Sequence, residues 1–263
     1  MNVPRGPATL DSLVPWLDDL LQTDATPDYA GALNGLQLAH SGPVSRVAAA
    51  VDASLRSVEL AVEFGANLMI VHHGLFWSGA QPIRGALHRK LKLLLDNDIA
   101  IYSSHLPLDR HPTMGNNALL ARVLHLSPSS TWLPYKGVDI GVVATTDTPT
   151  RDLAERVRAF AITHAHHAVI TRHDSTRQSR TVALCSGGGA SSESIRDAIA
   201  VGADTLIVGE GPHHTAIDAE EANLVVMYAG HYATETLGVQ ALAAAIAERW
   251  SLPWSFIPAP TGL

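Results

Sequence analysis

Imidazole and carboxylate side chains follow three of the apolar runs that the sequence marks as strands. These runs end at Val71, Ser103 and Ala229. The side chains that come after them are His72, His73, His105, Asp109, His231 and Glu235. In open α/β sheets ligands bind beyond the carboxyl ends of the strands, so this placement predicts a common site.

The chemistry of these side chains predicts a metal site. The expected ligands are His72, His73, Asp109, His231 and Glu235. Imidazole and carboxylate donors without thiolate suit zinc, manganese, iron or nickel. These donors are more than one tetrahedral ion needs, and either carboxylate could bridge two ions. We therefore expect two divalent metal ions, about 3.5–4 Å apart, of the kind that activates water for hydrolysis.

Local spacing supports one part of this site and restricts another. His231 and Glu235 are four residues apart at the start of a predicted helix, which places both side chains on one face. Adjacent residues of a regular strand point to opposite faces, so His72 and His73 can share a site only if the strand ends at Gly74. For any single histidine, a hydrogen-bonded surface residue is the simpler interpretation, but recurrence at separate strand ends favours a metal site.

A glycine-rich segment follows the strand that ends at Cys185. The backbone amides of Ser186, Gly187 and Gly188 could hold an anionic group of a small-molecule substrate. The alternative is a turn in which Ser191 or Ser192 caps the next helix.

Three more polar side chains are candidates for catalysis or substrate binding. Glu210 and His105 could move protons, and His213 could orient the substrate. Solvated loop residues are the alternative interpretation of Glu210 and His213, which lie in the segment Gly209 to His214.

Alternating strand and helix patterns predict the elements that position these residues. An apolar run over 47–51, an amphipathic stretch over 54–64 and a second apolar run over 68–71 indicate a βαβ unit. Similar patterns continue to a last helix over 232–249. The sequence therefore predicts the α/β class.

A stretch rich in Ser and Pro at 127–134 is the predicted domain boundary. We expect two α/β domains with mostly parallel βα units and helices packed on the sheets. Residues 1–126 with 225–263 form the predicted metal-binding domain, and 127–224 form the second domain. A single doubly wound sheet fits the periodicity nearly as well.

Composition excludes several classes of protein. The formal charge of −7 and the pI of about 6.0 leave no global positive field for nucleic acid. The absence of an 18-residue apolar run argues against a membrane protein. A lone cysteine, Cys185, allows no internal disulfide and is expected to pack as a small apolar residue, which fits a reducing cytoplasm.

Four segments together resemble a known family. They are VHHGLFW, SSHLPLDRHPTMGNNALLARVL, GEGPHH and AGHYATETLG. The family is the NGG-interacting-factor-like family, also called GTP cyclohydrolase type-two-like, and the resemblance runs from about residue 34 to the final helix. It implies a two-domain α/β subunit, a dinuclear metal centre and a ring-shaped homohexamer whose sites face an inner cavity.

Transferred by position, the family's ligands fall on His72, His73, Asp109, His231 and Glu235. The resemblance further implies that His105, Glu210 and the turn after Cys185 line the adjacent pocket. Where many relatives have threonine after the first histidine of H-x-x-x-D, this chain has Leu106, so a hydroxyl contact to substrate is absent there. A fold does not fix a reaction, and this donor set lacks the Cys-containing zinc site of cyclohydrolase I, so GTP itself is not assigned as substrate.

Three functional hypotheses follow. The first is a dinuclear metal-dependent hydrolase that acts on a nucleotide-like or heterocyclic amide substrate. The second is a non-catalytic metal-binding regulatory or accessory protein. The third is a single structural zinc ion, with the remaining histidines merely exposed.

Overall fold

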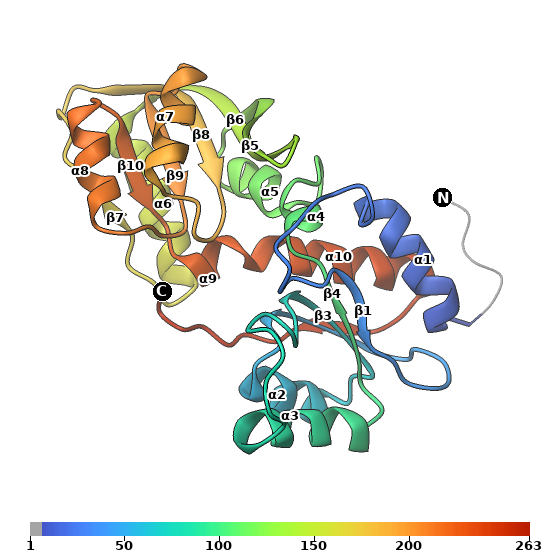
Figure 1. Ribbon diagram of the computed structural model, residues 1–263. Helices are drawn as coiled ribbons and strands as arrows, with labels where there is room; N and C mark the ends of the chain where they lie inside the picture. Colours follow the sequence, from blue (N-terminus) through green and yellow to red (C-terminus); the bar gives the residue numbers. More distant parts are fainter. Residues whose placement is uncertain (1–6) are drawn as a thin grey trace. The chain divides into compact units, whose positions relative to one another are not determined.

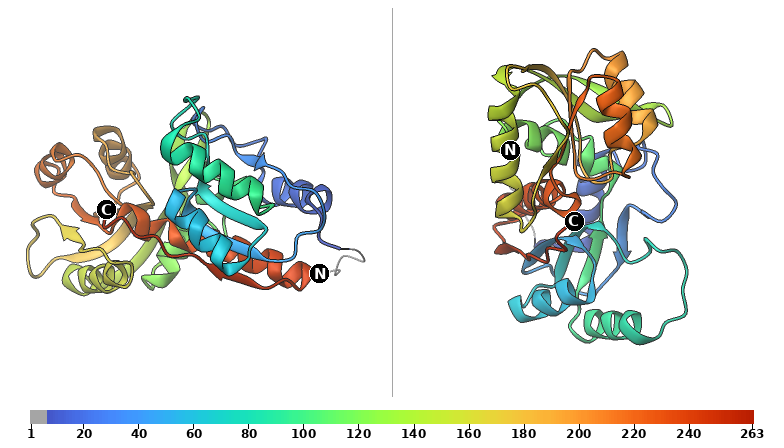
Figure 2. Two further views of the ribbon diagram at one scale, coloured as in Figure 1. Left: turned by 90° about the horizontal axis from the view of Figure 1, so that it is seen from below. Right: turned by 90° about the vertical axis from the view of Figure 1, so that its left-hand side faces the viewer.

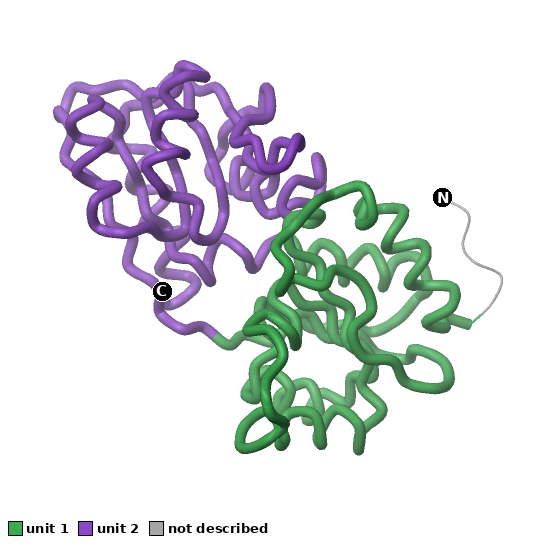
Figure 3. The backbone as a smooth tube through the Cα atoms, in the orientation of Figure 1, with its two compact units in different colours: residues 1–108, 238–259 green, residues 109–237, 260–263 purple. Residues whose placement is uncertain are grey.

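The computed structural model describes residues 7–263 of the chain and divides into two compact units. Unit 1 comprises residues up to 108 together with 238–259, and unit 2 comprises 109–237 and 260–263 (Figure 3). Each unit has its own sheet with helices packed against it, which confirms the predicted α/β class with two sheets. These bounds differ from the predicted domains, because residues 109–126, 225–237 and 260–263 lie in unit 2.

The sheet of unit 1 is parallel except at one edge. Its order is β1 (Gly35–Leu38), β4 (Ala100–Ser103), β3 (Leu68–His73), β2 (Val47–Asp52) and β11 (Trp254–Phe256). Only β1 runs antiparallel to its neighbour. Helix α2 (Leu55–Phe64) connects β2 to β3, so the predicted βαβ unit is confirmed.

Alternating side chains of this sheet contact helices on its two faces. Ala48, Met69 and Ile101 share a buried cluster with α2 and with α3 (Gly85–Asp96), which lie side by side in Figures 1 and 2. On the other face the Tyr102 hydroxyl donates to Asp18 of α1 (Leu10–Leu21) at 2.7 Å. The sheet is therefore covered on both faces, as the near-continuous apolar strands require.

Unit 2 is a sheet between two helical layers. The strand order is β5 (Ser127–Tyr135), β6 (Val138–Pro149), β8 (Gln178–Cys185), β9 (Thr205–Val208), β10 (Val225–Tyr228) and β7 (Val169–Ile170). Only β8, β9 and β10 are mutually parallel, so the expectation of mostly parallel strands describes unit 1 better than unit 2.

Two helices cover each face of this second sheet. Helices α5 (Asn116–Val123) and α6 (Thr150–Thr163) share one buried cluster with it, and α7 (Ser192–Ala200) and α8 (His214–Glu221) share another. The remaining helices are α4 (Leu106–Asp109), α9 (His231–Thr234) and α10 (Thr236–Trp250). Side chains of α5 share one buried cluster with β6, β8 and β10, which explains why the residues after 108 belong to unit 2.

The Ser- and Pro-rich stretch, predicted to be a domain boundary, is a strand inside unit 2. Residues 127–135 form β5, an edge strand that pairs antiparallel with β6 through a turn at Lys136 and Gly137. Proline lacks the N–H that the hydrogen bonds of a central strand need, but it is tolerated in an edge strand. Pro128 and Pro134 are therefore why the sequence pattern did not predict a strand here. The short strands β1 and β11 also lay outside the predicted pattern.

No helix within residues 7–263 is long and apolar enough to cross a bilayer.

A close approach inside unit 2 yields a stability test. A Cβ atom at Gly141 would collide with the Trp132 ring and lie 2.8 Å from the Leu184 carbonyl oxygen, which accepts the Trp132 indole hydrogen bond. We expect Gly141→Ala to lower the free energy of unfolding by about 1–3 kcal/mol, because the buried indole must move. Urea unfolding followed by circular dichroism measures this, with the exposed substitution Ser130→Ala as the control. Equal stability of both variants would contradict the crowding.

Candidate metal centre

Each histidine after the strands of unit 1 uses its Nδ1 nitrogen to contact an oxygen. The Nδ1 of His72 is 2.9 Å from the Ser104 carbonyl oxygen, and that of His73 is 2.9 Å from the Asp52 carboxylate. The Nδ1 of His105 is 2.8 Å from the Asp28 carboxylate. An oxygen acceptor fixes the proton on Nδ1, so Nε2 carries the lone pair that a metal ion would bind.

These three imidazoles form one group. Their candidate ligand atoms all lie within 4.8 Å of one another, and the ring centroids of His72 and His73 are 4.8 Å apart. Strand β3 does end at His73, directly before Gly74, as the shared site required. Because His72 is held by the segment after β4 and His73 by the last residue of β2, both rings lie at the carboxyl end of the sheet in spite of their adjacency.

The Asp28 carboxylate, which contacts His105, accepts hydrogen bonds at both of its oxygens. Oδ1 accepts from His105 and from the Tyr29 amide at 2.7 Å, and Oδ2 accepts from the Asn34 side chain and the Leu106 amide. Burial raises the pKa of Asp28, but these donors and the neighbouring imidazole outweigh burial and lower its pKa. Asp28 therefore stays ionised and holds both His105 and the backbone that follows it.

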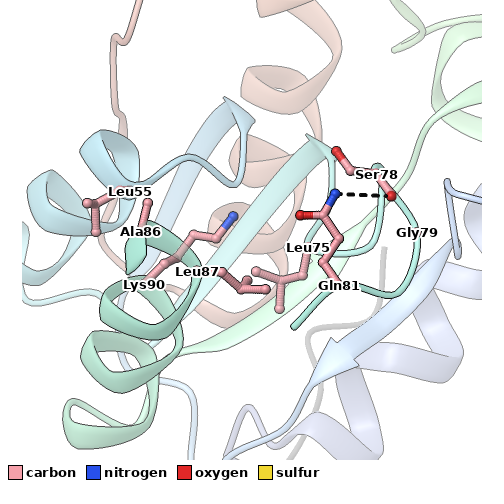
Figure 4. Close-up of a pocket in the computed structure, with 8 residues that line it drawn as sticks. All are labelled: Leu55, Leu75, Ser78, Gly79, Gln81, Ala86, Leu87 and Lys90. Carbon is pink, nitrogen blue, oxygen red and sulfur yellow. Dashed lines mark hydrogen bonds between the residues drawn. The ribbon is translucent and has the colours of Figure 1, made fainter. Parts of the chain in front are cut away.

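Asp52 carries a similar contact and has a cation nearby. Burial lowers the pKa of Lys90, and the charge of Asp52 opposes this effect. The Lys90 amine donates to the Ala53 carbonyl oxygen at 2.5 Å. Lys90 lines a cavity of about 160 Å³ whose opposite wall includes Leu75, Ser78 and Gln81 from the loop after β3 (Figure 4).

In unit 2 the carboxylate of Asp109 is fixed by two neutral donors. Its Oδ1 accepts from the Asn116 amide at 2.8 Å and from the Ser186 hydroxyl at 2.9 Å. The side chain is buried. Asn117 holds the Ser186 backbone amide at 2.6 Å, so the first turn of α5 positions both the carboxylate and its serine partner.

His231 lies between two glutamates. Its Nδ1 is 2.8 Å from Glu210 Oε1, and its Nε2 is 3.2 Å from Glu235 Oε1. Burial lowers the pKa of His231, but Glu235 and then Glu210 outweigh burial and raise its pKa to about 9. A ligand atom lies about 2.0–2.2 Å from a zinc ion, so the 3.2 Å separation is short enough for His231 and Glu235 to share one ion.

The turn after β8 links these two groups of unit 2. Gly187 has a φ of +62°, and a Cβ atom there would collide with Glu235 Oε1. The Gly187 amide donates to the Thr234 hydroxyl at 2.9 Å. Ser186 therefore contacts Asp109, while the next residue, Gly187, packs against Glu235. Burial, and then the charges of Asp109 and Glu235, raise the pKa of the nearby Cys185 thiol.

The residues predicted to bind substrate have different surroundings. The amides of Ser186 and Gly187 already donate to side chains, whereas a Cβ atom at Gly188 would have only the His231 ring within 4 Å, at 3.9 Å. His213 is exposed at the start of α8. For the glycine-rich segment after Cys185, the alternative interpretation was a turn with a helix cap, and Ser191 does cap α7.

Several positioning residues were not identified from the sequence. Asp52 is the last residue of β2, so the strand-end argument could have found it. Asp28, Asn116 and Asn117 lie in a loop or a helix with no local pattern that distinguishes them. Their roles depend on tertiary contacts.

The buried Asp28 carboxylate predicts a pH-dependent contribution to stability. Its pKa lies below the ordinary value of 3.8, so the stabilisation is present above that pH and is lost as the pH falls through the lowered pKa. At about pH 5 we expect Asp28→Asn to be less stable than the native chain by about 1–3 kcal/mol, and at about pH 3 the gap should narrow. Urea unfolding at both pH values measures the gap. The exposed Asp24→Asn serves as control, and a gap independent of pH would refute the ionised state of Asp28.

The glycine turn gives a matched pair of variants. Gly187→Ala adds strain at a positive φ and a collision with Glu235, whereas the new Cβ atom of Gly188→Ala makes an ordinary contact with the His231 ring at 3.9 Å. We expect the first to weaken Mn²⁺ or Zn²⁺ binding at least tenfold in a competition titration, and the second to leave affinity within about twofold. If both variants bind metal like the native chain, the contact of Gly187 with Glu235 has no part in metal binding.

Comparisons with known proteins identify the family of the chain. The model of the family Duf34/NIF3 (NGG1p interacting factor 3) matches residues 8–261. The chain is 38% identical over 261 residues to the "GTP cyclohydrolase 1 type 2 homolog" of Deinococcus radiodurans, with 98% of this chain and 96% of that protein covered.

Solved structures show the same fold. TTHA1606 from Thermus thermophilus is 38% identical and has a TM-score of 0.83, with 96% of this chain and 99% of that chain covered. The protein ybgI, described as of unknown function, is 34% identical and has a TM-score of 0.85, with 97% and 100% covered. The resemblance seen in the sequence motifs is thereby confirmed, and the chain belongs to the Duf34/NIF3 family.

Proposed function

We propose that this chain is a dinuclear metal-dependent hydrolase that acts on a nucleotide-like or heterocyclic amide substrate. The observation that carries the proposal is shared by His72, His73, His105 and His231. Each has Nδ1 within hydrogen-bonding distance of a carboxylate or carbonyl oxygen, which is the arrangement typical of metal-binding histidines. The name of the Deinococcus radiodurans relative accords with a heterocyclic substrate.

The proposed ligands are His72 and His73 from unit 1 and Asp109, His231 and Glu235 from unit 2. In support, His72, His73, Asp109 and His231 are each oriented by a partner within their own unit: a carbonyl, a carboxylate, a hydroxyl or an amide. Glu235 contacts the imidazole of His231, which belongs to the same unit. Oriented side chains lose less entropy on binding an ion than free ones, which strengthens the site.

The reaction divides between the ions and the side chains around them. Bound zinc, manganese, iron or nickel ions would supply Lewis acidity and lower the pKa of water. We assign proton transfer to His105, because Asp28 holds its Nδ1 and leaves Nε2 as the basic nitrogen beside His72 and His73.

The structure suggests other roles for two residues that the sequence assigned to catalysis or substrate binding. Glu210 contacts His231, and Ser186 contacts Asp109, so we propose that both position metal ligands. Gly188 and His213 remain the proposed contacts for an anionic group of the substrate.

A non-catalytic metal-binding regulatory or accessory protein is the second candidate function. One observation favours it: Glu210, a side chain predicted to move protons, is engaged with His231. The same ions would then serve metal handling or partner recognition.

We also propose that the chain forms a homo-oligomer in the cytoplasm. The homohexamer implied by the family resemblance is the specific expectation. The lone, buried Cys185 is compatible with a reducing compartment. Light scattering coupled to gel filtration measures the oligomeric mass directly.

Metal content tests the site. We expect the freshly purified protein to contain about two transition-metal ions per chain by elemental analysis, and His73→Ala and Glu235→Gln each to lose at least one of them. The exposed residues His88 and Glu221 provide the matched controls His88→Ala and Glu221→Gln, which should retain both. One ion per chain in the native protein would leave the single structural zinc hypothesis standing.

Turnover separates the two remaining candidates. The metal-loaded protein is screened for hydrolysis of nucleotides and cyclic amides beside Glu235→Gln and His105→Gln. Loss of metal-dependent turnover in both variants supports the hydrolase, with His105→Gln retaining its metal. Two ions per chain with no turnover of any substrate would favour the accessory role.

A further inference from the structure

Two partly exposed aromatic side chains of unit 1 lie against the imidazole group. The Trp77 ring centroid is 4.7 Å from that of His73 and 4.7 Å from that of His105. The Tyr29 ring centroid is 5.8 Å from that of His105. His105 is thus in contact with an aromatic ring from each of two separate loops, one before β1 and one after β3.

The two loops are fixed to each other. A Cβ atom at Gly31 would lie 2.6 Å from the Trp77 carbonyl oxygen, so the two backbones are in direct contact there. The Gln37 side chain donates to the carbonyl oxygens of Ala32 and Leu33 and accepts from the Leu75 amide at 2.6 Å. One glutamine therefore holds both loops, and the positions of the two aromatic residues are set before any ligand arrives.

These aromatic rings remain open to solvent although their loops are held. Trp77 is 40% exposed and Tyr29 is 51% exposed. An exposed indole beside polar groups gains free energy when a planar ring stacks on it, and little ordering is needed where the loop is already fixed. The Trp77 and Tyr29 rings are therefore suited to a flat aromatic ligand whose reacting atoms reach the imidazole Nε2 atoms.

We propose that Trp77 and Tyr29 form the binding surface for the planar heterocyclic ring of the substrate, a nucleobase-type ring system. The proposal rests on the proposed hydrolase function for its location beside the metal ligands. Binding of the ring is a separate property, which a measurement without turnover can detect.

Guanosine 5′-monophosphate and ribose 5-phosphate are the probes, because they share the sugar and the phosphate and differ by the heterocyclic ring. We expect calorimetric titration of the purified native protein to show at least about tenfold tighter binding of the nucleotide. Trp77→Leu should remove most of this difference, Tyr29→Leu part of it, and Trp77→Phe should restore part. Binding of ribose 5-phosphate and the metal content should not change.

Phe76→Leu is the matched control, since Phe76 precedes Trp77 on the same loop and is equally exposed at 40%. It should bind both probes like the native chain. The proposal is overturned if the native protein binds both probes equally or neither, or if Trp77→Leu, with unchanged metal content and thermal unfolding temperature, keeps the preference. Tighter binding of the nucleotide without any turnover would contradict the hydrolase function but not the aromatic binding surface. Turnover without tighter binding of the nucleotide would contradict the aromatic binding surface but not the hydrolase function.

Discussion

The candidate site depends on one repeated interaction, an imidazole Nδ1 held by an oxygen. Carboxylates hold His73, His105 and His231, and a backbone carbonyl holds His72. Each such bond places a proton on Nδ1 and fixes the direction of Nε2, which a free side chain on a loop does not achieve. The parallel strands and the turns after them serve to bring these acceptors to the carboxyl ends of the two sheets.

Much of this could be predicted from the sequence because the strand ends are local signals. The apolar runs before His72, Ser104 and Gly230 are short, continuous and followed by polar residues, and the structure ends β3, β4 and β10 within two residues of these positions. The acceptors were harder to find. Asp28 lies 77 residues from its imidazole partner and Asp52 lies 21 residues from its own, so no spacing rule connects them.

The glycine-rich turn shows why residue type alone did not give its role. Its composition suggested free amides that cradle an anion, and the sequence analysis assigned it to substrate on that basis. In the structure two of those amides are already used, and the glycine at 187 is needed because Glu235 occupies the space where a side chain would stand. The same lack of a Cβ atom can serve a ligand or a neighbouring carboxylate, and only tertiary packing distinguishes them.

The edge strand β5 bears on how copies of this chain could associate. An unpaired strand edge offers a row of hydrogen-bonding groups that another chain can extend into a continuous sheet. Pro128 and Pro134 withhold amide hydrogens from β5, and at the far side of the same sheet β7 has only two residues. Both margins of the second sheet thus resist extension by a further strand, so assembly of subunits would have to use side-chain surfaces instead of shared backbone ladders.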